Sequence, residues 1–128
     1  MTHYHAMVWI DHREAKIFGI GLEESDLSKI DDRAPHHHIH RKADHVGLGT
    51  APLDSHFLHD VAKLLAPTQA ILIAGPGRAK TDLASFLTEH YPAAAKNIWR
   101  VEAMDHPTNG ELVAAARKYF HAEDRMRP

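Results

Sequence analysis

Histidine is the residue type in this sequence that most clearly suggests chemistry, with thirteen copies among 128 residues. Five of them form a candidate zinc site: His36, His38, His40, His56 and His59. The first three alternate along an extended segment, where such side chains share one face at a spacing of about 6.5–7 Å. The last two lie three residues apart on a predicted helix. Imidazole is a common zinc ligand, so the pattern predicts a metal-binding protein or a metal-dependent hydrolase.

The same His-rich segment, residues 34–52, also offers a contact for RNA. Its candidate contact residues combine positive charge, flat rings and glycine: His38, His40, Arg41, Lys42, His45, Gly47 and Gly49. Basic side chains neutralise phosphates, planar ones suit unpaired bases, and glycines let the backbone approach closely. A solvated loop without a ligand is the plainer interpretation. The sequence leaves all three open.

A weaker candidate, for an anion, is the turn formed by Gly75, Pro76 and Gly77, where a predicted strand runs into a predicted helix. A helix N-terminus favours a negative charge, and Gly75, Gly77 and Lys80 would make the contacts. The turn is not a Walker A loop, because the Gly-x4-Gly-Lys-Ser/Thr pattern is missing and proline removes one N–H group. A purely structural turn is the competing interpretation.

Two carboxylates at strand ends could hold metal ions, as in nucleases folded like ribonuclease H. These would be Asp11 after the first predicted strand and Glu102 or Asp105 at the last one. No second carboxylate pair supports such a site, so the favoured interpretation is that Asp11 serves its turn. We assign no catalytic residue. A protein without enzymatic activity is the favoured interpretation, and the metal-dependent hydrolase stays open as the alternative.

Composition narrows the class of protein. An apolar fraction of 44% and a charged fraction of 25% are typical of a folded globular chain. The formal charge is −2 with neutral histidines, and those histidines add positive charge below about pH 6.5. The absence of cysteine excludes disulfides and thiolate metal sites. No signal peptide or membrane span is recognisable, so we expect a cytoplasmic protein without membrane contact.

The elements that must position these residues follow from hydrophobic periodicity. Short apolar stretches predict three strands joined by tight turns, at residues 6–11, 15–20 and 27–33. Beyond the His-rich segment the pattern predicts a helix capped by Asp54 or Ser55, a buried strand over 69–74 and a second helix that ends near Pro92. A strand over 98–103 and a last helix capped by Thr108 or Asn109 complete the chain.

This order of elements predicts an α/β fold with a single mixed sheet of about five strands and about three helices. The first three strands should form an antiparallel meander. The last two strands, joined by a helix, should be parallel. Residues 1–128 are expected to form one domain, with the His-rich segment as a long loop.

Two stretches resemble the middle domain of Pelota and of the class-1 release factors of archaea and eukaryotes. Val8 to Ala15, VWIDHREA, resembles a hairpin of that family that contains V-D-R-R-E-A. Ile71 to Asp82, ILIAGPGRAKTD, resembles its buried strand, Gly-Pro-Gly turn and helix with an early lysine. The segment from Val101 to Ala115, with Gly110, is similar to the loop and last helix. The resemblance covers roughly residues 6–120 and implies the same fold.

The His-rich segment also resembles short bacterial proteins labelled "translational machinery protein", in HIHRKA at 38–43 and Gly-Leu-Gly at 47–49. Release factors carry Gly-Gly-Gln at the corresponding place to promote ester hydrolysis, and residues 35–52 lack that motif. No counterpart of the family's first and last domains is recognisable either. The resemblance therefore implies a non-catalytic protein associated with the ribosome or structured RNA. The alternatives are a metal-dependent protein that uses the histidines and an interaction module that forms homo-oligomers through an exposed strand edge.

Overall fold

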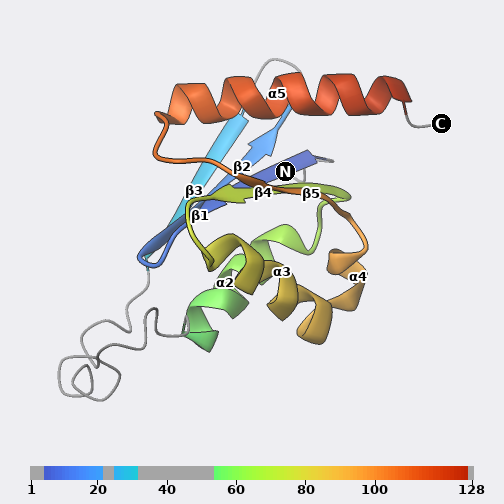
Figure 1. Cartoon of the computed structure of the whole chain (residues 1–128). Coiled ribbons are helices and arrows are strands. Elements are labelled where there is room, and N and C mark those ends of the chain that lie inside the picture. The colour runs from blue at the N-terminus through green and yellow to red at the C-terminus, as the bar shows by residue number, and fades with distance from the viewer. Residues whose placement is uncertain (1–4, 22–24, 32–53, 127–128) are drawn as a thin grey trace.

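One five-stranded mixed sheet organises the protein (Figure 1). The computed structural model describes residues 5–21, 25–31 and 54–126. The strands are β1 (His5–Ile10), β2 (Glu14–Ile20), β3 (Ser25–Asp31), β4 (Ala70–Gly75) and β5 (Ile98–Ala103). The helices in these ranges are α2 (Ser55–Leu65), α3 (Ala79–His90), α4 (Pro92–Ala95) and α5 (Asn109–Met126).

The strand order is β3-β2-β1-β4-β5. Strands β1, β2 and β3 pair antiparallel, whereas β4 is parallel to both β1 and β5. The expected meander, the parallel β4–α3–β5 unit and the central place of the apolar run are confirmed. The α/β class predicted from the sequence is therefore confirmed as well.

Apart from one-residue shifts at the bounds of β1, β2 and β4, two details of the prediction differ from the structure. Strand β3 starts at Ser25, two residues earlier than expected, because Ser25 pairs with Ile20 and extends the ladder to the end of β2. The short helix α4 was not predicted. It forms because Tyr91, with φ −136° and ψ 61°, leaves the helical conformation and ends α3, and Pro92 then starts a new turn.

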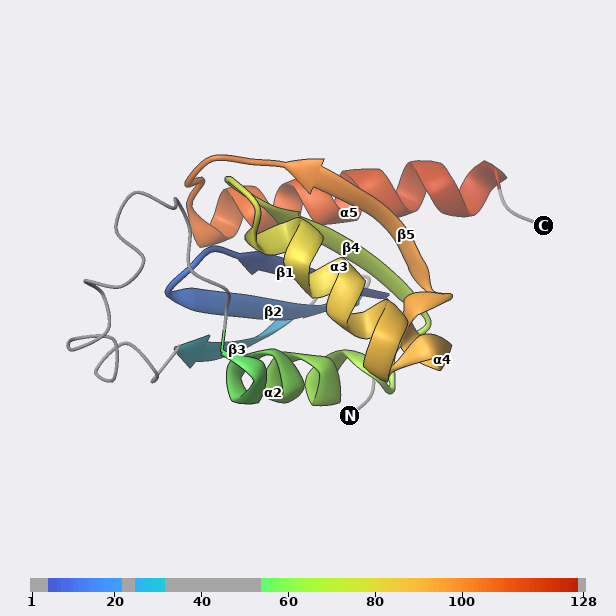
Figure 2. The same ribbon diagram turned by 60° about the horizontal axis from the view of Figure 1, so that its bottom comes forward.

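Helices cover both faces of the sheet (Figures 1 and 2). Helices α2 and α3 pack on one face, against alternate residues such as Val8, Ile10 and Ile73. Helix α5 packs on the other face, against residues such as Trp9 and Leu72. Because β4 lies between two strands and under helices on both sides, all six of its residues are buried. No helix in the described ranges is long and apolar enough to cross a membrane.

Helices α2 and α5 begin at side-chain caps that the sequence predicted. The carboxylate of Asp54 accepts hydrogen bonds from the backbone N–H groups of His56 and Phe57, at 3.1 and 3.2 Å. Thr108 and Glu111 form a capping box, in which each side chain accepts from the backbone N–H of the other. These caps satisfy donors that the first turn of a helix leaves without partners.

Replacing Asp54 with alanine is expected to lower the free energy of unfolding by about 1 kcal/mol. The two N–H groups at the start of α2 would lose their acceptor, although water can replace part of the interaction. Urea titration measures the change, and Ser55→Ala is the matched control because Ser55 is exposed and follows the cap. Equal stabilities of the two variants would show that the cap contributes nothing.

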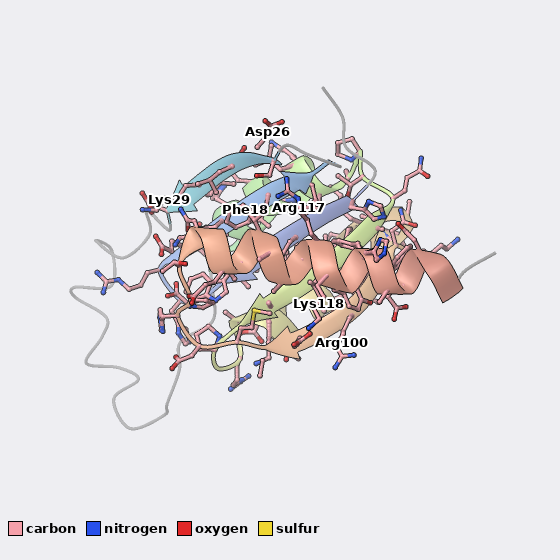
Figure 3. All side chains as sticks on the ribbon, turned by 90° about the horizontal axis from the view of Figure 1, so that it is seen from above. Phe18, Asp26, Lys29, Arg100, Arg117 and Lys118 are labelled. Carbon is pink, nitrogen blue, oxygen red and sulfur yellow. The ribbon has the colours of Figure 1, made fainter. Side chains whose placement is uncertain are left out.

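Strand β3 is an exposed edge of the sheet on which a lysine is held in place (Figure 3). The Lys29 Nζ atom lies 3.1 Å from the Glu14 carboxylate and 4.0 Å from that of Asp31. The hydrogen bond and charge of Glu14, followed by the charge of Asp31, raise the pKa of Lys29 above its ordinary value. A charged lysine on an edge strand disfavours pairing with another strand.

Candidate functional site at the carboxyl edge of the sheet

The candidate site is the edge at which the parallel strands β1, β4 and β5 end, here called the carboxyl edge. Three connections meet there: the turn after β1, the Gly-Pro-Gly turn after β4, and the segment between β5 and α5 (Figure 1). Strand β3 also ends on this side, because Asp31 pairs with Glu14 beside the β1–β2 turn. Helix α2 begins on the same side (Figure 2). The described residues that flank the His-rich segment therefore lie at the carboxyl edge.

Asp11 organises the turn between β1 and β2. Its Oδ1 atom accepts hydrogen bonds from the backbone N–H groups of Arg13 and Glu14, at 2.8 and 3.0 Å. Its own backbone N–H donates to the carbonyl oxygen of Glu14 at 3.0 Å. These contacts support the interpretation that Asp11 serves the turn, and they leave Oδ2 directed toward other groups at the edge.

His106, which was not among the residues predicted from the sequence, lies between two carboxylates. Its Nδ1 atom is 3.0 Å from Asp105 Oδ1, and its Nε2 atom is 3.7 Å from Asp11 Oδ2. The imidazole stands edge-on to the Trp9 ring at a centroid distance of 5.1 Å. Trp9 Nε1 donates to the carbonyl oxygen of Asp105 at 2.9 Å. This network ties the segment before α5 to the β1–β2 hairpin.

Lys16 on β2 extends the network toward α5. Its Nζ atom donates to Asn109 Oδ1 at 3.0 Å and lies 5.6 Å from the centre of the Trp9 ring. Of the two carboxylates considered as metal partners of Asp11, Glu102 contacts Arg100 on its own strand, and Asp105 contacts His106. Within residues 5–21, 25–31 and 54–126, no three His, Asp or Glu side chains are grouped as metal ligands.

The Gly-Pro-Gly turn needs both of its glycines for backbone reasons. Gly75 has φ +150°, and a Cβ atom there would lie 2.1 Å from the carbonyl oxygen of Ile10. Gly77 has φ +65°, in the left-handed region that favours glycine. The Lys80 side chain donates to the Gly77 carbonyl. The structure thus brings Gly75, Gly77 and Lys80 together at the start of α3, and anion binding by them stays a prediction.

Exposed arginine and histidine side chains accompany these turns. His12 and Arg13 follow β1, and Arg78 precedes α3. The His12 ring is adjacent to the Gly77 turn, since its Cε1 atom is 3.9 Å from the place of a Cβ atom on Gly77. Arg13 and Arg78 form no salt bridge with another residue of the described ranges. Both guanidinium groups are therefore available to an anionic partner.

The candidate zinc ligands are described only in part. His56 is exposed on the first turn of α2. His59 packs between α2 and α3, with Nδ1 at 2.9 Å from the Tyr91 hydroxyl oxygen and its ring 4.8 Å from that of Phe86. The remaining predicted contact and ligand residues lie outside the described ranges: His36, His38, His40, Arg41, Lys42, His45, Gly47 and Gly49.

Comparison with known proteins finds likenesses to Pelota and to a termination factor. No protein-family model matches the sequence. A stretch of 55 residues is 46% identical to the Pelota homolog of Methanosphaerula palustris. The match covers 41% of this chain and 16% of that protein. The crystal structure of Archaeoglobus fulgidus Pelota matches with a TM-score of 0.61 and 20% identity, over 98% of this chain and 38% of that one. An archaeal translation termination factor matches with a TM-score of 0.57 and 15% identity, over 95% and 38% of the two chains.

These likenesses confirm the resemblance to Pelota that the sequence indicated, in local sequence and in fold. The chain spans little more than a third of the length of these two solved proteins. The likeness therefore extends to one folding unit. The activity of those whole proteins cannot be assigned to this chain from that likeness.

Proposed function

We propose that this protein is a non-catalytic ribosome- or RNA-associated protein related to translation factors. The observation that carries the proposal is the agreement of sequence and fold with Pelota, supported by the fold of a factor named for translation termination. Peptide release is not part of the proposed function, because the sequence has no Gly-Gly-Gln motif.

The proposed contact surface combines the carboxyl edge with the His-rich segment. Arg13 and Arg78 supply exposed guanidinium groups at the edge. Arg41 and Lys42 add two cations from the His-rich segment. Guanidinium and ammonium groups bind phosphate oxygens and release counterions from the nucleic acid. With an overall formal charge of −2, binding must depend on such a local concentration of positive charge.

Replacing Arg13 and Arg78 together with alanine is expected to weaken binding to ribosomes roughly tenfold at about 0.1 M salt. The salt dependence should also flatten, because fewer phosphates would be neutralised. Co-sedimentation with purified ribosomes over a salt series measures both effects.

The matched control removes two cations from the opposite end of the sheet. Lys63 lies in the last turn of α2, and Lys96 lies in the turn before β5; both are exposed. The Lys63→Ala, Lys96→Ala variant has the same net charge as the arginine variant and should bind like the unaltered protein. Equal losses in the two variants would mean that only net charge matters and that the carboxyl edge is not the contact surface.

A further inference from the structure

The second edge of the sheet, strand β5, differs from the β3 edge in what it offers a partner. It is the last strand in the sheet order, so no described strand pairs with its outer side. Arg100, Val101 and Ala103 are exposed, and Val101 exposes 39% of its surface. An uncovered strand edge presents unpaired N–H and C=O groups that can pair with another strand.

The pairing of β5 with β4 determines which face each side chain occupies. Arg100 pairs with Leu72 and Glu102 with Ala74, whose side chains pack under α5. Arg100 and Glu102 therefore lie on the α5 face, where Arg100 Nε is 3.1 Å from Glu102 Oε1. Val101 pairs with Ile73 and lies on the opposite face, which α2 and α3 cover.

We infer that β5 is a dimerisation edge that pairs antiparallel with β5 of a second copy of this chain, with the two-fold axis at Val101. Residues directly opposite in such a pair share one face of the sheet. Arg100 then lies opposite Glu102 of the second copy, Glu102 opposite the second Arg100, and the two Val101 side chains meet. The two ion pairs within the copies join into one network of four alternating charges.

The order of the charged residues along β5 indicates that the partner is a second copy of this chain. A two-fold axis brings each residue to its symmetry mate, so an interface between copies must be self-complementary. The sequence Arg100-Val101-Glu102 meets this condition, because opposite charges flank an apolar centre. Figure 3 shows Lys118 of α5 and Arg100 toward the same margin of the molecule.

The β3 edge does not meet the condition. Antiparallel pairing about its central residue, Ser28, would place Leu27 opposite Lys29 and Asp26 opposite Ile30. In each of these pairs an apolar side chain would lie directly opposite a charged one. Lys29 is also engaged by Glu14 and Asp31 within its own copy. Of the two edges, β5 is the one that suits a second copy.

The inference is independent of the proposed role at the ribosome. A contact between two six-residue strands is small, so the dimer should be weak and should depend on protein concentration. Sedimentation velocity of the full chain, over a concentration series up to about 1 mM, is expected to show a monomer–dimer equilibrium. A monomer throughout that series would overturn the inference.

A single engineered cysteine tests the position of the two-fold axis. The sequence contains no cysteine, so Val101→Cys can form a disulfide only with another copy. Under mild oxidation it should form covalent dimers faster than Leu27→Cys, the matched control on the β3 edge, where Leu27 is 47% exposed. Equal rates for the two variants would overturn the proposed pairing.

Charge exchange tests the register. Glu102→Arg should abolish the dimer, because four positive side chains would then meet at the interface. The double variant Arg100→Glu, Glu102→Arg restores alternating charges and should dimerise like the unaltered chain. If the double variant stays monomeric while the unaltered chain dimerises, Arg100 and Glu102 do not lie opposite one another across the interface.

Discussion

Replacing Gly75 with alanine is expected to lower the free energy of unfolding by about 4 kcal/mol or more, which approaches the whole stability of a small domain. The new Cβ atom would lie 2.1 Å from the carbonyl oxygen of Ile10, and the backbone at Gly75 has φ +150°. Both residues end central parallel strands, so neither backbone can move without disturbing the pairing of β1 with β4. Thermal and urea unfolding of the purified variant measure the loss.

Gly77→Ala is the matched control for that substitution. Gly77 also has a positive φ, of +65°, but the nearest atom to an added Cβ is His12 Cε1 at 3.9 Å. Only the left-handed backbone conformation is then unfavourable, at about 1 kcal/mol. If the two alanine variants were equally stable, close approach to Ile10 would not be the reason for glycine at 75.

Replacing Arg41 and Lys42 with alanine is expected to reduce binding to ribosomes or RNA by on the order of 10- to 100-fold at about 0.1 M salt. Each cation that contacts a phosphate contributes about 0.7–0.9 to the slope of log affinity against log salt. The slope should therefore fall by up to about 1.8 when both are lost. Filter binding or co-sedimentation at several salt concentrations gives the slope directly.

His38→Ala, His40→Ala separates RNA contact from zinc binding in the same segment. In the RNA model these histidines add charge only when protonated, so the variant should differ from the unaltered protein mainly below about pH 6.5. In the zinc model they are neutral ligands, and the variant should lose metal at pH 7–8. A variant that matches the unaltered protein in metal content and RNA affinity from pH 6 to 8 contradicts both models.

Local signals in the sequence were sufficient for most of the fold. The apolar run from Ala70 to Ala74 predicts a strand buried on both faces, and β4 is that strand. Asp54 and Thr108 were each one of two predicted caps, and their side chains bond to residues two or three positions away. Such contacts are local in sequence, so residue type and spacing are enough to find them.

The arrangement of the carboxyl edge depends on contacts between distant residues. His106 meets Asp11 and Trp9 only because β1, β4 and β5 run parallel and end together. His59 meets Tyr91 across two helices, 32 residues apart. Neither contact can be recognised from the spacing of residues in a single sequence. An Asp-His pair shortly after a predicted parallel strand is a local sign that could have drawn attention to His106.

Co-sedimentation of the untagged chain with purified ribosomes over a salt series tests the central claim most directly. The proposed function predicts that the protein pellets with ribosomes at low salt and is released progressively as salt rises, because phosphate contacts carry the binding. Protein that stays in the supernatant at the lowest salt, or pelleting that salt does not change, would contradict a ribosome or RNA contact through this surface.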